Sequence, residues 1–128
     1  MYQGISNEEP AFSWNAAPLA GAVPLRQSSV RQDALQVALL VAEVTGTDVC
    51  SLYAARRGQA HVSLARQMAM YLTHVVHGHA LTSVGEAYGR DRTTVAHACM
   101  IVEERRDEAE FDRTISRLEN LVEKGGVR

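Results

Sequence analysis

The stretch that decides the fold is LTSVGEAYGRDRTTVAHAC, residues 81–99. Its first half predicts a short helix, because Ser83 stands three residues before Glu86, the spacing of a capping box, with the preceding threonine as an alternative N-cap. Gly89 is placed to end that helix, since glycine readily adopts the left-handed conformation. Asp91 suits the N-cap of a second helix, because its carboxylate can accept backbone N–H groups. The stretch therefore predicts a helix-turn-helix.

The second helix separates into two faces. Val95, Cys99 and Val102 follow helical spacing and are expected to face a core. Arg92 and Thr93 then point outward from the first turn, which is the end that a recognition helix places in the major groove. There an arginine can pair with guanine, and a threonine methyl can touch the thymine methyl. A helical hairpin with a polar loop is the alternative that spacing alone leaves open.

Composition points to one small helical domain in a reducing compartment. The chain has 128 residues, 46% of them hydrophobic and only 5% aromatic, which favours a compact all-α bundle over a sheet sandwich. Cys50 and Cys99 form no CxxC pair or disulfide framework. No apolar run reaches membrane length, and the start of the chain does not resemble a signal peptide. We therefore expect a cytoplasmic protein.

The domain boundary is expected near residue 28. Residues 1–27 contain all three prolines and several glycines and alanines, which predicts a flexible N-terminal tail. Phe12 and Trp14 stand out in it, either as a docking peptide or as aromatics that pack loosely on their own domain. Residues 28–125 form the predicted helix-turn-helix domain.

The first helix is expected over Val30–Val44. Ser28 or Ser29 can cap it, and Thr45-Gly46 ends it. Its apolar positions are Ala34, Leu35, Val37, Ala38, Leu39, Leu40, Val41 and Val44.

Three further elements follow from periodicity. A short turn is expected to start at Thr47-Asp48. The clearest helix is expected from Ser63 to His77, with Gly78 at its end. A charged run at 103–108 predicts a helix break, and a last helix then ends at Gly125-Gly126. The apolar positions are Val49 and Leu52, then Leu64, Met68, Tyr71, Leu72, Val75 and Val76, then Phe111, Ile115, Leu118 and Val122.

The net charge of −2 hides a basic middle. Residues 1–53 carry 2 basic and 5 acidic side chains, residues 54–100 carry 5 and 2, and residues 101–128 carry 6 and 8, so the segments have charges of −3, +3 and −2. Such a positive zone suits nucleic acid, although an ordinary mixed surface is the alternative. Within it the adjacent Arg56 and Arg57 are candidates for phosphate contact, or belong to a solvated loop. Arg66 opens the next helix, where an anion is favoured.

An enzyme is the weakest interpretation. His74, His77 and His79 could suggest a metal site, but no cysteine or carboxylate stands at ligand spacing, and histidines at a helix end are favoured by the helix dipole. No nucleophile–base pair is evident. We therefore expect no catalytic residues, no metal and no cofactor.

Three segments carry a family resemblance: ARQMAMYL at 65–72, VGEAYG at 84–89 and RDRTTVAHAC at 90–99. Together they resemble the C-terminal DNA-binding domain of DnaA, the bacterial chromosomal replication initiator. The similarity spans about 30–122. It implies an all-helical fold related to the Trp-repressor type of helix-turn-helix.

The resemblance also implies residue roles. Asp91, Arg92 and Thr93 match base-reading positions in the major groove, and Thr94 and His97 match positions near bases or backbone.

Four arginines complete the expected interface. Arg66 matches a phosphate contact, and Arg56 and Arg57 lie where the family is basic. We expect these three and Arg90, at the mouth of the turn, to bind phosphates.

The chain departs from the family in places. It has one glycine before Arg90 where the family has two, Arg92 where the family has histidine, and Leu64 where the family has a minor-groove arginine. It also lacks a GxxxxGK[ST] phosphate loop. We therefore predict a nucleoid-associated regulator of transcription or replication that binds double-stranded DNA sequence-specifically, without ATPase activity, nucleotide or membrane binding, and with replication or transcription proteins as further partners. The alternative is a protein-interaction module on the same fold that has lost DNA binding.

Overall fold

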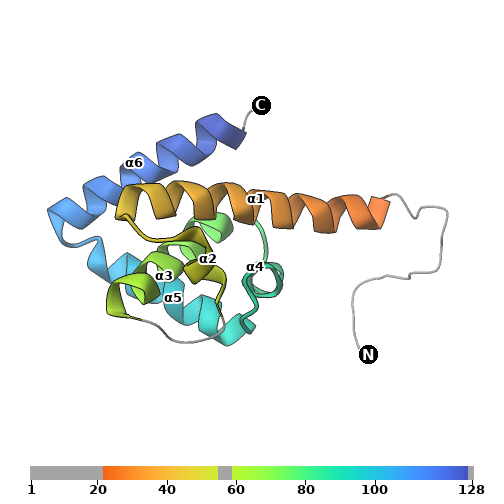
Figure 1. Cartoon of the computed structure of the whole chain (residues 1–128), viewed down its shortest axis with the longest axis horizontal. Helices are drawn as coiled ribbons and strands as arrows, with labels where there is room; N and C mark the ends of the chain where they lie inside the picture. Colours follow the sequence, from red (N-terminus) through yellow and green to blue (C-terminus); the bar gives the residue numbers. More distant parts are fainter. Residues whose placement is uncertain (1–21, 55–58, 127–128) are drawn as a thin grey trace.

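The structure is a computed structural model that describes residues 22–54 and 59–126, with side chains for 30–54 and 59–125. These residues form six helices and no strand, packed as a compact bundle (Figure 1). The all-α prediction is confirmed. The helices are α1 (Ala22–Thr45), α2 (Val49–Tyr53), α3 (Ala60–Val75), α4 (Leu81–Tyr88), α5 (Arg92–Arg105) and α6 (Ala109–Gly126).

Helix α1 begins earlier than the sequence predicts. It starts at Ala22, so the expected caps Ser28 and Ser29 lie inside the helix, and the expected tail overlaps its first six residues. Pro24 misled the prediction, because proline is tolerated in the first turn, where its missing N–H has no intrahelical partner. The rest of the predicted tail lies outside the described residues. The end at Gly46 is confirmed, with a positive φ of 76°.

Two of the apolar positions named for this helix lie outside the core. Leu35 and Leu39 are 48% and 50% exposed, whereas Val37 and Val41 are completely buried. The apolar pattern of α1 is therefore wider than the face that the bundle covers.

Helix α3 is the centre of the core. It contacts α1 on one side and α5 on the other, and it also touches α2, α4 and α6 (Figure 1). Consequently most of its middle residues are buried on all sides, with only Gln67 partly exposed among them: Ala65, Arg66, Met68, Ala69, Met70, Tyr71, Leu72 and Thr73. Val75 was predicted to join this face but is 47% exposed, because it lies at the end of α3 beyond that run.

Tyr88 joins three helices in the core. Its hydroxyl donates to the Ala34 carbonyl oxygen at 2.9 Å and lies 3.1 Å from the Thr73 hydroxyl. Its ring stacks on Tyr53 with centroids 5.2 Å apart. Burial raises the pKa of Tyr88, so the phenol stays neutral and hydrogen-bonded. The end of α4 is thereby fixed against α1, α2 and α3.

Arg106 holds the corner between α5 and α6. Its guanidinium bonds Asp112 at 2.6 Å and Glu119 at 2.9 Å, and it also donates to Tyr71 and Ser116. The hydrogen bonds to Glu119, then Asp112 and Tyr71, raise the pKa of Arg106. The charged run over 103–108 does contain the break between the two helices, but the break lies at 106–108, because residues 103–105 still belong to α5. Beyond it, the predicted apolar residues of α6 are buried or packed against the core: Phe111, Ile115, Leu118 and Val122.

Within the described part of the chain, no helix combines the length and apolar character needed to cross a bilayer.

Candidate nucleic-acid interface

Helices α4 and α5 form the predicted helix-turn-helix. Gly89 ends α4 in the left-handed conformation, with φ 73° and ψ 33°. The N–H of Arg90 donates to the Gly85 carbonyl oxygen at 2.7 Å, and the N–H of Gly89 points to that of Glu86 at 3.4 Å. These two bonds make a Schellman motif, which needs a residue that tolerates positive φ at its centre. The role predicted for Gly89 is confirmed.

The predicted start of α4 is wrong. The helix begins at Leu81 and its N-cap is Ala80, which offers no side-chain hydrogen bond. Ser83 and Glu86 therefore lie inside the helix and form no capping box.

Gly85 allows the turn to close against α4. A Cβ at this position would overlap the carbonyl oxygen of Arg90 and approach the main chain of Asp91. Only a residue without a side chain lets the backbone of the turn pass so close to the helix. Sequence reasoning missed this role, since a helical glycine carries no local signal of what packs against it.

The N-cap of α5 is as predicted. Asp91 has extended backbone dihedrals, and its Oδ1 accepts the N–H of Thr94 at 2.8 Å. Hydrogen bonds from the backbone and then the hydroxyl of Thr94 lower the pKa of Asp91. A carboxylate at this end also interacts favourably with the helix dipole.

This cap predicts a measurable pH dependence. Because the pKa of Asp91 is lower in the folded protein than its ordinary 3.8, its contribution to stability is complete above that value and is lost as the pH falls through the lowered pKa. We expect Asp91→Asn, which keeps an accepting oxygen but no charge, to be slightly less stable at neutral pH and equal to the wild type in strong acid. Urea denaturation over a pH series measures the difference, and a deficit that is the same at every pH would contradict the assignment.

The faces of α5 divide as predicted, with one addition. Val95 and Val102 are fully buried, and Cys99 is half-buried. Ala98, which the pattern did not single out, is also buried at 1% exposure.

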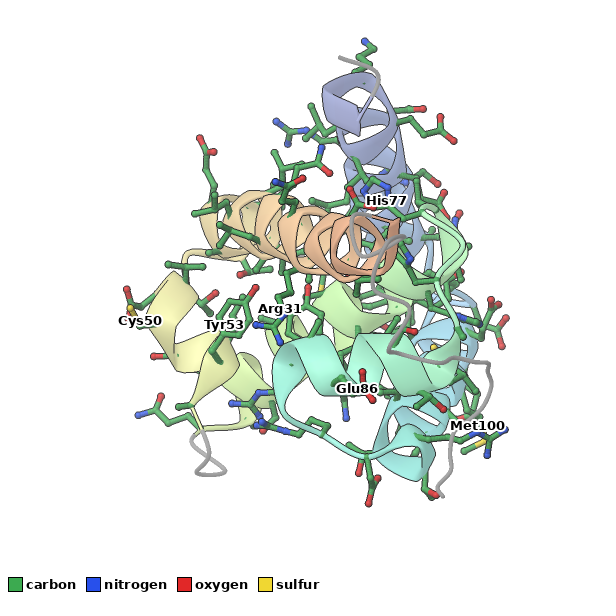
Figure 2. The ribbon with its side chains drawn as sticks, turned by 90° about the vertical axis from the view of Figure 1, so that its right-hand side faces the viewer. Arg31, Cys50, Tyr53, His77, Glu86 and Met100 are labelled. Carbon is green, nitrogen blue, oxygen red and sulfur yellow. The ribbon has the colours of Figure 1, made fainter. Side chains whose placement is uncertain are left out.

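The opposite face of α5 is open to solvent. The side chains predicted to read bases are all exposed: Asp91, Arg92, Thr93, Thr94 and His97. Ala96 and Met100 continue this face, and Met100 is labelled at the edge of the molecule in Figure 2. Among the described residues, no carboxylate forms an ion pair with Arg92. The amino end of α5 therefore presents an unpaired cation next to the positive end of a helix dipole.

Arg66 does not lie where the sequence placed it. Because α3 begins at Ala60, Arg66 falls in the second turn, where it is only 6% exposed. Its Nε donates to the Leu52 carbonyl oxygen and its Nη2 to that of Ser51, each at 3.0 Å. Burial, and then the charge of Arg90, lower the pKa of Arg66. The expectation of an outward-facing arginine is corrected: this side chain closes the carboxyl end of α2.

Arg90, like Arg66, donates to main-chain carbonyl oxygens. It is half-buried, and its guanidinium donates to the carbonyl oxygens of Tyr88 at 3.1 Å and Ala54 at 2.8 Å. Two arginines from different elements thus satisfy the carbonyls at the end of α2. Arg56 and Arg57 lie outside the described residues, but Ala54, just before them, is held beside the turn by this bond.

The three candidate metal ligands bind protein groups instead. His74 Nδ1 lies 2.7 Å from the His79 carbonyl oxygen, and His79 Nε2 lies 2.7 Å from Asp33. His77, labelled in Figure 2, bonds the amide of Gln36 at 2.9 Å. Among the described residues, no group of three or more histidine, cysteine or acidic side chains is arranged to hold a metal. These histidines join the end of α3 to α1.

Two comparisons bear on this site. The family model for the bacterial DnaA protein helix-turn-helix matches residues 35–102. A solved structure described as a DNA replication initiation factor superposes with a TM-score of 0.68 at 26% sequence identity. The match covers 86% of this chain and 37% of that one, so the chain spans well under half of the longer protein.

Proposed function

Because the chain belongs to the family of the bacterial DnaA helix-turn-helix, a DNA-binding domain, we propose that it binds double-stranded DNA sequence-specifically. In this proposal the amino end of α5 enters the major groove, as in other helix-turn-helix proteins. The observation that carries it is the exposure of Arg92 and Thr93 on the first turn of α5, with no carboxylate paired to Arg92 among the described residues.

We assign a role in DNA contact to each of the exposed residues at the amino end of α5. Arg92 pairs with guanine, and Thr93 contacts a thymine methyl. Thr94 and His97 lie further along the same face and contact bases or the adjacent backbone. Asp91 is more restricted, because one carboxylate oxygen holds the cap and only the other remains for a cytosine amino group.

Of the four arginines expected to bind phosphates, we now propose this role for two. We assign direct phosphate binding to Arg56 and Arg57. Arg66 and Arg90 donate to main-chain carbonyls, which supports a positioning role for both.

The wider role that we propose is regulation of transcription or replication by a nucleoid-associated cytoplasmic protein. The 128 residues contain no GxxxxGK[ST] motif, so we propose no ATPase activity. Double-stranded DNA is the principal partner, and replication or transcription proteins are further candidates.

Replacing Arg92 with alanine tests the base-reading role. On a site selected from a random duplex pool, we expect a loss of about 1–3 kcal/mol in binding free energy, together with relaxed preference at one base pair. Binding to unrelated duplexes should change much less, because that binding depends on phosphate contacts. Fluorescence anisotropy on both duplexes measures the difference.

Arg113→Ala is the matched control, since Arg113 is an exposed arginine on α6, away from the helix-turn-helix. Equal losses on selected and unrelated duplexes would argue against base reading by Arg92. If the wild-type protein shifts no duplex even at low salt, the protein-interaction module becomes the better interpretation.

A further inference from the structure

One exposed row of side chains on α1 has no role in the proposed function. Arg31, Leu35, Leu39 and Glu43 follow one another at four-residue steps, and all four are exposed. The two leucines are 48% and 50% exposed, and they are two of the four large exposed hydrophobic residues in the described chain. Side chains at this spacing form a ridge along the helix, the feature that packs against another helix.

The two leucines lie outside the face of α1 that the bundle covers, since Ala34, Val37 and Val41 are buried there while Leu35 and Leu39 are about half exposed. Arg31, at the amino end of the ridge, is drawn in Figure 2 on the side of α1 that faces α4. Figures 1 and 2 both place α1 and α5 on opposite sides of α3. Among the described residues, neither Arg31 nor Glu43 takes part in an ion pair.

The order of charges along the ridge selects its partner. Arg31 stands at one end of the ridge, Glu43 at the other, and the two leucines lie between them. Both pairs of positions, 31 with 43 and 35 with 39, are symmetric about residue 37. An antiparallel copy of the same ridge places Arg31 opposite Glu43 and Leu35 opposite Leu39, twice each by symmetry. A parallel copy would instead place like charges together, which opposes association.

We propose that α1 pairs with α1 of a second copy of this chain, antiparallel and with two-fold symmetry. Two half-exposed leucines from each copy give less contact than the roughly 800 Å² per partner of a stable interface. The pairing is therefore weak, with a dissociation constant of the order of 100 μM. Because α3 separates α1 from α5, both recognition helices stay free in the pair. The pairing does not depend on DNA binding.

Charge reversal tests the pairing. The Arg31→Glu protein and the Glu43→Arg protein each place like charges opposite one another in both symmetry-related contacts. We expect each alone to dimerise at least about tenfold more weakly than the wild type by sedimentation equilibrium. An equimolar mixture should regain dimers, because both charge pairs are restored in the heterodimer. The matched control, Arg113→Glu on α6, should dimerise like the wild type.

Cysteine cross-linking tests the direction of the helices. Leu35→Cys and Leu39→Cys are made separately in a Cys50→Ser background, with an affinity tag on one of them so that cross-linked species differ in size. On mild oxidation of the mixture, antiparallel pairing should give the mixed disulfide in more than the statistical half of the product. Parallel pairing would give mainly cross-links between identical chains.

Several results would overturn the proposal. These are a wild-type protein that stays monomeric at millimolar concentration, a charge-reversed mixture that does not recover dimers, or a preference for cross-links between identical chains. None of these results depends on DNA, so failure here leaves the proposed function untouched.

Discussion

Gly85→Ala is expected to destabilise the protein by about 1–3 kcal/mol, although alanine is ordinarily the better helix former. The added methyl group overlaps the Arg90 carbonyl oxygen, which belongs to the backbone of the turn and cannot swing aside. Relief therefore requires the turn to move away from α4, and α5 moves with it. We expect the loss in the free energy of DNA binding to exceed the loss in the free energy of unfolding. The reason is that α5, whose amino end we propose to contact bases, begins two residues after Arg90.

Gly125→Ala provides a matched control. Its added methyl would also overlap a neighbour, but that neighbour is the amide end of the Gln36 side chain, which can move at the cost of its hydrogen bonds to Val122 and His77. We therefore expect a smaller loss in the free energy of unfolding than for Gly85→Ala, measured by urea denaturation for both variants. If Gly85→Ala is as stable as the wild type, the close approach of turn and helix is not a structural requirement.

Arg66→Met is expected to cost about 3 kcal/mol of stability. The substitution keeps much of the buried stem but removes the donor to the carbonyl oxygen of Leu52 and leaves that of Ser51 with only the N–H of Ala54. Hydrogen bonds from charged groups contribute about 1.5–3 kcal/mol each, and buried unpaired acceptors are costly. Arg66→Lys should recover part of the loss, because one ammonium cannot reproduce the two-pronged contact of a guanidinium.

The competing role for Arg66 makes a different prediction. A phosphate-binding arginine would leave stability unchanged when replaced, while affinity for all duplexes and its salt dependence would fall. Thermal denaturation of Arg66→Met without DNA, beside Arg113→Met as an exposed control, separates the two. A fully stable Arg66→Met protein would return Arg66 to the interface.

The sequence predicted best those features that depend on neighbours in the chain. Gly89 ends α4 and Asp91 caps α5 through contacts within three residues or so, and the buried and exposed faces of α5 follow from spacing alone. The same local signals correctly located the carboxyl end of α1 and the break before α6, but not the start of α1.

Features that depend on distant partners were not predictable. Arg66 donates to carbonyl oxygens 14 and 15 residues away, and Arg90 donates to one that is 36 residues away as well as to that of nearby Tyr88. The sequence shows none of the distant partners, so both arginines were predicted to be free for phosphate. Leu35 and Leu39 fit an apolar helix pattern, but only the packing of α3 against one side of α1 decides which leucines are covered. Gly85 needs the turn already folded over it before its lack of a side chain has any meaning.

The hydrogen bonds from Arg66 and Arg90 to the carboxyl end of α2 have a consequence for how α2 unfolds. A helix of five residues has no stability in isolation. It persists because Arg66 of α3 and Arg90 of the turn both hold its last carbonyls. We therefore expect the segment Val49–Ala54 and the turn between α4 and α5 to form one cooperative unit, whose amide hydrogens become accessible to exchange together rather than one element at a time.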